Sequence, residues 1–381
     1  MSKALIVTST ASMVDQFLLP SAYILQGMGY DVSVACNFIN GNTCDFERVE
    51  SLKKTLRLHN IVFYQIDFER NVMDFKQNYK AYKQLDRIVS TEHYDLVHCH
   101  SPIGGVIGRL VAKKQRKHGT KVFYTAHGFH FYKGAPIKNW LLYYPVEKLC
   151  SYFTDVLITI NHEDYSLATR KMKAKRVEYI PGVGVDLSRF ENLQVDRVKK
   201  RHEIGVPKDD LLLLSVGELN ENKNHQIIIR AIAKLKDPKI HYAIAGVGNK
   251  KDYLMDLSEQ LGISNQVHLL GFRSDIPELN FAADIFCFPS MREGLSVSLM
   301  EAMASGLPCM VSCIRGNTDL ISEDGGVLFD PLVEEDAADK LNELLMKNLN
   351  DLGVQNRLKV HVFSSINVNQ QMKMIYEGVL E

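Results

Sequence analysis

The fold of this chain is decided by one stretch, Ala282-Ala-Asp-Ile-Phe-Cys-Phe-Pro-Ser290-Met-Arg-Glu-Gly-Leu-Ser-Val-Ser-Leu-Met-Glu-Ala-Met-Ala-Ser-Gly-Leu-Pro308. Its first eight residues are mostly apolar and end in a proline, which predicts a buried strand. Ser296 is a suitable N-cap, an apolar helical face follows it, and the final Gly-Leu-Pro stops the helix. Cys309-Met-Val-Ser312 predicts the next strand. The stretch therefore predicts a strand–loop–helix–strand unit whose helix begins at the carboxyl edge of a parallel sheet, where ligands bind.

Two glutamates flank the start of this helix. Glu293 precedes it, and Glu301 lies eight residues later, roughly 7 Å along the helix axis from the cap at about 1.5 Å per residue. Helix-start N–H groups bind phosphate, and carboxylates accept hydrogen bonds from hydroxyls. This layout suits a nucleotide-sugar diphosphate, which carries hydroxyls at both ends and phosphates between them. The alternative is an amphipathic helix with two solvated glutamates, which an isolated motif of this length would favour.

Strand-like runs alternate with helical patterns along the rest of the chain, which predicts a doubly wound α/β architecture. In the first half the predicted strands are 4–9, 31–36, 61–65, 96–100, 121–125, 156–160 and 177–180. In the second half they are 211–216, 241–245, 267–270, 285–288, 309–312 and 326–329. Predicted helices span 16–28, 76–92, 195–203, 225–236, 250–261, 334–347 and 363–380.

A hinge between two domains is predicted near Pro181-Gly-Val-Gly-Val-Asp186, where a proline and two glycines follow the last strand of the first set. We therefore expect an acceptor-side domain over residues 1–185 and a nucleotide-sugar domain over residues 186–362. The segment 363–381 is expected to be a C-terminal helix that crosses back to the first domain.

The composition is that of an ordinary soluble globular protein, with 46% hydrophobic and 24% charged residues in 381. No apolar run of 18 residues is present, and the first residues enter a strand without a signal sequence. The seven cysteines are scattered and include no Cys-x-x-Cys, which is typical of reduced thiols. These features predict a cytoplasmic protein.

The net charge of zero hides an asymmetry between the two halves. Residues 1–185 carry 24 Lys and Arg against 16 Asp and Glu, whereas residues 186–381 carry 21 against 29. A basic first half suits an anionic partner or a membrane surface. The equal alternative is that the two halves attract each other.

Candidate binding residues in the second half follow predicted strands. Lys223 lies at a strand-to-helix turn, where a cation can neutralise a phosphate. Arg273, in the turn Gly271-Phe-Arg-Ser, is placed either to contact a nucleotide base or simply to lie at the surface. Ala245-Gly-Val-Gly-Asn249 lacks the third glycine and the later acidic residue of a dinucleotide fingerprint, so a nicotinamide enzyme is excluded.

In the first half, His127 follows a predicted strand beside a glycine, a position from which imidazole can bind a sugar hydroxyl or stabilise developing charge. His98-Cys-His100 has no third ligand nearby, which argues against zinc. Residues 129–153 are rich in aromatics and lysines, and four cations occupy 113–117. That composition suits either a membrane interface or a helix with an aromatic core face and solvated lysines.

Several catalytic patterns are missing from the sequence. It has no Gly-x-Ser-x-Gly elbow, phosphate-binding P-loop or zinc-protease motif, and no Asp-x-Asp to hold a metal against a diphosphate. A departing diphosphate would therefore have to be stabilised by the helix start and Lys223, without a metal ion or cofactor.

Four motifs together resemble the retaining glycosyltransferases of family four. They are Glu293-Gly-Leu-Ser with Glu301-Ala-Met-Ala-Ser-Gly-Leu-Pro, Val216-Gly-Glu-Leu with Asn222-Lys-Asn-His, Ala126-His-Gly, and Gly184-Val-Asp186. The resemblance implies the GT-B fold, with two Rossmann-like domains facing across a cleft. The stretch Thr125-Ala-His-Gly-Phe-His-Phe-Tyr-Lys-Gly-Ala-Pro136 further resembles the branch that serves bacterial capsule and exopolysaccharide assembly.

This resemblance implies roles for individual residues. Glu301 would bind the donor ribose and Glu293 the hydroxyls of the transferred sugar, while the amides of Leu295, Ser296 and Val297 would hold the diphosphate that Lys223 neutralises. His127 would contact the sugar from the first domain, and the donor's own phosphate would help to deprotonate the acceptor. Two departures stand out. The family's usual arginine after Val-Gly is Glu218 here, with Arg273 or Arg292 as possible replacements, and its Gly-Gly pair after the first strand is replaced by Ser9-Thr-Ala-Ser-Met-Val14.

The expected activity is retaining transfer of a sugar from a UDP-type nucleotide sugar to a lipid-linked or saccharide acceptor in cell-surface polysaccharide synthesis. Expected partners are the donor, the acceptor and the inner face of the cell membrane, met through the N-terminal domain, and nucleic acid is not among them. Two alternatives stay open: a nucleotide-sugar epimerase of the same fold, and a catalytically silent subunit that only binds sugar nucleotides, which Glu218 motivates.

Overall fold

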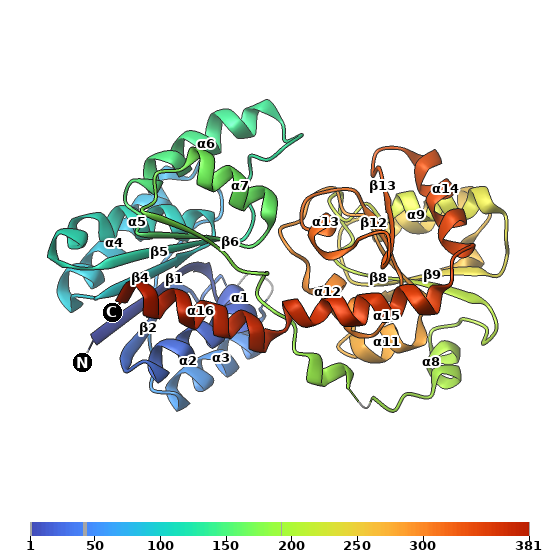
Figure 1. Cartoon of the computed structure of the whole chain (residues 1–381), viewed down its shortest axis with the longest axis horizontal. Coiled ribbons are helices and arrows are strands. Elements are labelled where there is room, and N and C mark those ends of the chain that lie inside the picture. Colours follow the sequence, from blue (N-terminus) through green and yellow to red (C-terminus); the bar gives the residue numbers. More distant parts are fainter. Residues whose placement is uncertain (1, 41–43, 192, 381) are drawn as a thin grey trace. The chain divides into compact units, whose positions relative to one another are not determined.

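The computed structural model describes residues 2–40, 44–191 and 193–380, so Met1 and Glu381, the outer limits of the expected domains, lie outside it. The chain forms two compact units, one of residues Met1–Val183 with Val368–Glu381 and one of residues Gly184–Asn367. In each unit, helices cover both faces of a parallel sheet (Figure 1). The predicted doubly wound α/β class is confirmed.

The first unit contains a seven-stranded sheet in the order β3-β2-β1-β4-β5-β6-β7, with every neighbouring pair parallel. Strand order reverses between β1 and β4, and ligands of such sheets bind at the carboxyl ends of the strands beside that reversal. The strands are β1 Ser2–Thr10, β2 Tyr30–Asn37, β3 Val62–Gln65, β4 Leu96–His100, β5 Lys121–Ala126, β6 Val156–Thr159 and β7 Arg176–Tyr179.

The helices of the first unit include one from the far end of the chain. Helix α16 spans Ser365–Leu380, and its buried Tyr376 packs on Phe123 and lies 2.6 Å from Nδ1 of His98 through its hydroxyl. The other helices are α1 Ala11–Met13, the π-helical turn η1 Val14–Leu18, α2 Leu19–Gly27, α3 Phe46–Leu58, α4 Phe75–Glu92, α5 Pro102–Gln115, η2 Arg116–His118, α6 Ile137–Ser151 and α7 His162–Lys171.

The second unit contains a six-stranded parallel sheet in the order β10-β9-β8-β11-β12-β13, and here the order reverses between β8 and β11. Its strands are β8 Leu211–Val216, β9 Ile240–Ala245, β10 Val267–Gly271, β11 Ile285–Phe288, β12 Cys309–Ser312 and β13 Gly326–Phe329. Its helices are η3 Leu187–Phe190, α8 Arg197–Glu203, α9 Gln226–Leu235, α10 Lys251–Gln260, η4 Ser264–Gln266, α11 Ile276–Ala282, α12 Val297–Ala304, α13 Asn317–Leu320, α14 Glu334–Leu345, α15 Leu349–Lys359 and η5 Val360–Phe363.

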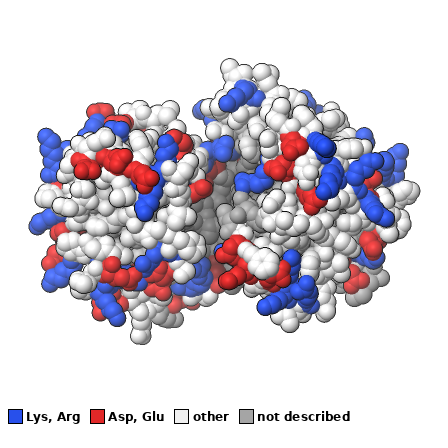
Figure 2. All heavy atoms as spheres, turned by 180° about the vertical axis from the view of Figure 1, so that it is seen from behind, with Lys and Arg blue, Asp and Glu red and all other residues white. Residues whose placement is uncertain are grey.

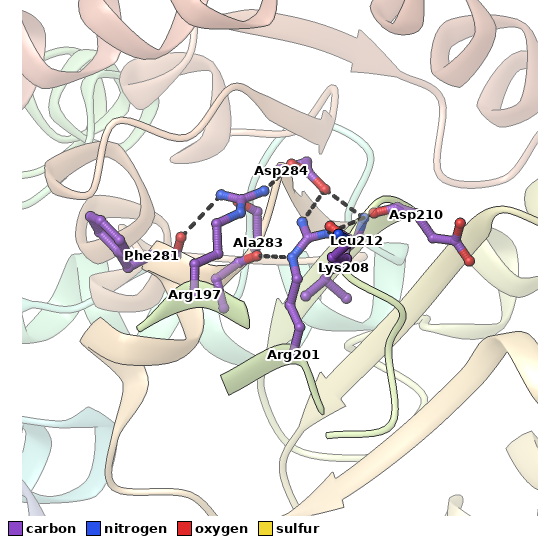
Figure 3. Close-up of polar contacts among 9 residues, drawn as sticks. Arg197, Arg201, Lys208, Asp210, Leu212, Phe281, Ala283 and Asp284 are labelled. Atoms are coloured by element: carbon purple, nitrogen blue, oxygen red, sulfur yellow. Dashed lines mark hydrogen bonds and ion pairs between the residues drawn. The ribbon is translucent and has the colours of Figure 1, made fainter. Parts of the chain in front are cut away.

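A carboxylate anchors the amino-terminal edge of each sheet. Asp284, directly before β11, accepts a hydrogen bond of 2.7 Å from the N–H of Leu212 and pairs with Arg201 at 2.5 Å and with Arg197 (Figure 3). Arg201 is buried and also donates to the carbonyls of Ala282, Lys208 and Asp210. Asp155, directly before β6, occupies the matching place in the first unit, where it accepts from Val122 N–H and pairs with Arg116. In both units, therefore, an aspartate directly before a strand links an arginine of a helix to the sheet.

Candidate active site

The start of α12 lies at the strand-order reversal of the second unit. β11 ends at Phe288, and the loop 289–296 leads from its carboxyl end into the helix. The Ser296 hydroxyl caps the helix by accepting from Leu299 N–H at 3.4 Å. Leu295 and Ser296 are buried, and the first N–H groups of a helix have no partner within it. This helix start therefore presents backbone donors and the positive end of the helix dipole at the ligand edge of the sheet.

Lys223 and Glu293 form an ion pair beside this helix start. Lys223 Nζ lies 2.7 Å from Glu293 Oε1, and their side chains are 19% and 13% exposed. The ammonium also lies 4.5 Å from the ring centroid of Phe288, the last residue of β11. Lys223 follows β8 and Glu293 follows β11, so the two strands that flank the reversal each supply one charge. The sequence singled out both residues, and the structure places them in direct contact.

Asn222 joins the two loops through two hydrogen bonds, one at its backbone carbonyl and one from its side-chain amide. The carbonyl of Asn222 accepts from Met291 N–H at 2.7 Å, and the Asn222 amide donates to the carbonyl of Arg292 at 3.0 Å. Gly316 packs closely against the loop that contains Glu293. It has a φ of +80°, and a Cβ there would lie 2.2 Å from the carbonyl oxygen of Gly294. Only glycine satisfies both demands, so the position of the Glu293 loop depends on a distant glycine.

Glu301 has a charged partner that the sequence analysis missed. Its Oε1 accepts from Arg189 Nη1 at 2.9 Å, and the glutamate side chain is 11% exposed. Burial raises the pKa of Glu301, and the charge and hydrogen bond of Arg189 oppose this rise in part. Arg189 lies in η3, three residues after Asp186 of the Gly-Val-Asp motif. Nothing in its spacing from Glu301 signals the contact, because 112 residues separate them.

The remaining candidates of the second unit lie in other surroundings. Glu218 is exposed, and its carboxylate accepts from the Asn220 amide at 2.9 Å. Arg292 is exposed. Arg273 is held by two carboxylates at 2.5 Å each, those of Asp275 and Glu203. Lys223 therefore places a positive charge beside the helix start, and Arg189 places another farther along the helix at Glu301.

His127 belongs to a row of imidazoles at the carboxyl ends of β4 and β5. Its Nε2 lies 3.2 Å from Nδ1 of the buried His100, and His98 lies 4.1 Å from His100 between ring centroids. Burial lowers the pKa of His127 to about 4 and that of His98 to about 3, so both rings are neutral near pH 7. His100 Nε2 has no hydrogen-bond partner among the described residues. If His100 donates through Nδ1, His127 accepts at Nε2 and keeps its own donor on Nδ1.

The aromatic stretch 129–153 serves the core more than the surface. Phe129 and Phe131 are buried, and Trp140, Tyr143 and Tyr144 pack against the same core. The exposed apolar side chains of α6 are instead mostly aliphatic: Ile137, Leu141, Leu142, Val146 and Leu149. Lys138 and Lys148 accompany them on the helix.

The basic run before α6 is only partly available to a partner. Arg116 pairs with Asp155 at 2.7 Å and donates to the carbonyl of Tyr152. Lys113 lies 4.2 Å from the ring centroid of Phe153. On the face shown in Figure 2, basic and acidic side chains are interspersed.

Within residues 2–40, 44–191 and 193–380, no group of three or more His, Cys, Asp or Glu is arranged to hold a metal ion. Within the same ranges, no helix combines the length and the apolar character needed to cross a membrane.

Comparison with known proteins finds relatives over most of the chain. The family model described as Glycosyl transferases group 1 matches residues 196–359, and that described as Glycosyltransferase Family 4 matches residues 23–189. EpsD of Bacillus subtilis (strain 168), which is named as a glycosyltransferase, is 40% identical over 325 residues, 84% of this chain and 85% of EpsD. The UDP-Gal:alpha-D-GlcNAc-diphosphoundecaprenol alpha-1,3-galactosyltransferase of Escherichia coli is 30% identical over 263 residues, 67% of each chain. The crystal structure of Anabaena HepE in complex with UDP-glucose has a TM-score of 0.78 at 19% identity and covers 99% of this chain and 100% of that one.

Proposed function

The chain belongs to the family-four glycosyltransferases and has the GT-B fold, and from this premise we propose that it transfers a sugar from a UDP-sugar, with retention, to a lipid-diphosphate-linked saccharide in cell-surface polysaccharide synthesis. The observation that carries the proposal is the Lys223–Glu293 pair beside the start of α12, at the strand-order reversal. The names of the relatives support the choice of substrates, because the Escherichia coli enzyme is named for a UDP-sugar donor and a diphosphoundecaprenol acceptor.

In the proposed donor site, the diphosphate lies at the start of α12 against the amides of Leu295, Ser296 and Val297. These donors and Lys223 stabilise the negative charge that develops as the nucleotide departs, and fixed donors of this kind supply much of the rate enhancement in many enzymes. In the structure, Lys223 Nζ lies 2.7 Å from Glu293 Oε1. When the diphosphate engages Lys223, the Glu293 carboxylate becomes free to accept hydrogen bonds from the sugar.

Glu301 and Arg189 are proposed to act together on the ribose. The arginine holds Oε1 of the carboxylate at 2.9 Å and so orients it. An ionised carboxylate in a buried site makes strong hydrogen bonds to hydroxyls. Glu218 and Arg273 are also proposed as donor-site residues, although Glu218 is exposed and two carboxylates already hold Arg273.

His127 is proposed to donate a hydrogen bond to a substrate hydroxyl from Nδ1. Its lowered pKa keeps the ring neutral, so it would donate this hydrogen bond without carrying a positive charge. Deprotonation of the acceptor is assigned to the donor's own phosphate, as the resemblance to retaining enzymes of this family implies.

Contact with the inner face of the cell membrane is proposed through α6. The exposed residues Ile137, Leu141 and Leu149 follow one another at helical spacing along its surface, with Lys138 and Lys148 nearby. Exposed apolar side chains can enter the interface of a bilayer, and lysines are attracted to its anionic lipids. Leu141→Glu with Leu149→Glu should release the protein from anionic vesicles in a flotation assay, and retention at the wild-type level would contradict the contact.

The proposed reaction can be tested with the purified protein, a panel of UDP-sugars and a lipid-diphosphate-linked saccharide in anionic vesicles. We expect one donor to give UDP and an extended lipid, and nuclear magnetic resonance should show the donor's anomeric configuration in the product. A new sugar nucleotide formed from donor alone would identify an epimerase instead. Donor binding without turnover of any acceptor would identify a silent binding subunit.

A further inference from the structure

The first unit contains an apolar cavity that the proposed donor chemistry does not use. Its volume is about 280 Å³, and its walls come from the segment before α4, from α5, from α6 and from the loop after β5. Most of the lining is aliphatic or aromatic, including Val72, Phe75, Ile103, Val106, Phe131 and Val146. A cavity of this size and lining accepts a hydrocarbon group more readily than a sugar.

A second hollow of about 410 Å³, lined by polar as well as apolar residues, adjoins this cavity at the strand-order reversal of the same sheet. The two share Val72, Pro102, Ile103, His130 and Tyr143 in their walls, so they form one trough with a polar and an apolar end. The polar end lies where β1 and β4 finish, which is the ligand edge of this sheet.

Hydroxyls and a cation line the polar end. Ser9 and Ser101 hydroxyls lie 2.6 Å apart, and Ser9 Oγ accepts from Gly104 N–H in the first turn of α5. Arg70, an exposed residue, also lines this hollow. Ser101 has a φ of 60° and a ψ of 159°, a strained backbone conformation for a residue other than glycine, and such strain gathers at functional sites. This end therefore suits an anionic, hydroxyl-bearing group.

The one carboxylate in the wall of the apolar end is neutralised in place. Glu147 accepts from Arg109 Nη2 at 2.8 Å and from the Tyr124 hydroxyl at 3.3 Å. Arg109 is fully buried and lies 3.8 Å from the Tyr124 ring centroid. The pair leaves no uncompensated negative charge to repel a phosphate bound at the other end.

The apolar end also meets the exposed face of α6. Leu142 and Val146 line the cavity and are themselves 48% and 40% exposed. They continue the row of exposed residues Ile137, Leu141 and Leu149. A hydrocarbon chain held by a bilayer at α6 would thus meet the wall of the cavity at Leu142 and Val146.

We propose that the trough is the binding site of a lipid-linked acceptor, with the hydrocarbon next to its phosphate in the apolar cavity and the phosphate with its first sugar in the polar hollow. This assignment rests on the proposed function, from which the lipid-linked acceptor comes. It adds that the enzyme recognises the lipid itself, so acceptor affinity depends on the hydrocarbon as well as on the saccharide.

The test compares two acceptors with the same diphosphate-linked saccharide, one on a long hydrocarbon chain and one on a short, water-soluble alkyl chain. Val106→Phe narrows the apolar cavity, and Val198→Phe, at an exposed valine of α8, is the matched control. We expect Val106→Phe to raise KM for the long-chain acceptor about tenfold, as when about two methylene groups lose their burial. KM for the short-chain acceptor, KM for the donor and kcat should stay at the wild-type values.

Equal KM changes for both acceptors, or a change for neither, would overturn the assignment. Leu142→Trp, at a half-exposed position of the same wall, provides a second variant should Val106→Phe fail to fold by circular dichroism. Equilibrium binding of the radiolabelled long-chain acceptor in detergent micelles separates this proposal from the proposed reaction. Loss of binding in Val106→Phe would support acceptor binding in the cavity even if the wild type showed no turnover. Unchanged binding would refute it even if turnover were present.

Discussion

Replacing Lys223 by methionine tests the diphosphate site while keeping most of the side-chain volume. The structure gives two separate consequences. The helix start loses the positive charge of Lys223, and Glu293, whose side chain is only 13% exposed, loses its partner at 2.7 Å. The first consequence concerns turnover and the second concerns stability.

For turnover, loss of one fixed donor to a developing anion costs about 10²–10³ in kcat, or about 2.7–4 kcal/mol. For stability, the pair lies between the exposed case of about 0–1 kcal/mol and the fully buried case of about 3–5 kcal/mol. We therefore expect Lys223→Met to lower kcat at least 100-fold and the free energy of unfolding by about 1–2 kcal/mol.

The assay is UDP release at saturating acceptor, with urea unfolding measured on the same preparation. Lys234→Met is the matched control, because Lys234 is 38% exposed on the neighbouring helix α9 and pairs with the exposed Glu335. Glu293→Gln in the Lys223→Met background should restore stability without restoring turnover. A kcat within threefold of wild type in Lys223→Met would refute the assignment of this lysine.

Three further predictions follow from other contacts. Asp284→Asn should lower the free energy of unfolding by about 3 kcal/mol, because the buried Arg201 loses its carboxylate partner. The exposed Asp209→Asn is the control, and equal urea midpoints for the two variants would argue against this anchor. Burial lowers the pKa of His98 from 6.5 to about 3, so as the pH falls the unfolded chain takes up this proton at a higher pH than the folded chain does. The free energy of unfolding should therefore fall by about 3 kcal/mol between pH 7 and pH 4 from this group. Urea midpoints that do not change over this range would contradict a neutral His98. Glu301→Gln should weaken UDP affinity by about 10-fold or more. Because the pKa of Glu301 is raised, the UDP affinity of the wild type should begin to fall, as the pH is lowered, at a higher pH than an ordinary glutamate would cause. Calorimetry that finds equal UDP affinity in Glu301→Gln would exclude a contact with the ribose.

The strands were predictable because buried parallel strands are continuous apolar runs. All thirteen predicted strands are present, and β4, β8, β11, β12 and β13 have the predicted bounds. The stretch around α12 was predictable for a second reason, since its cap, apolar face and stop signal all agree.

Helix α5 was missed because its sequence contradicts its structure locally. Gly104, Gly105 and Gly108 lower its helix propensity. The reason for glycine appears only in three dimensions, where a Cβ on Gly105 would lie 2.4 Å from the Tyr124 ring. Helix α3 was also missed, although Val49, Leu52 and Leu56 have helical spacing and Asp45 caps the helix.

The site was predictable where each residue follows a strand and unpredictable where charges pair over long separations. Lys223 and Glu293 could be placed at one sheet edge from topology alone. Arg189 could not be matched to Glu301, nor Glu203 to Arg273, because only the folded chain brings these pairs together. The aromatic residues after β5 suited both a core and a membrane surface, and packing assigns most of them to the core.

The central claim is that the start of α12 holds the donor diphosphate. It is tested most directly by titrating UDP into amide-labelled protein and following the backbone resonances of Leu295, Ser296 and Val297 by nuclear magnetic resonance. We predict large, saturable shifts at these three amides, and a much weaker response in Lys223→Met at the same UDP concentration. Unchanged resonances at these amides, with saturable shifts elsewhere in the chain, would contradict the claim.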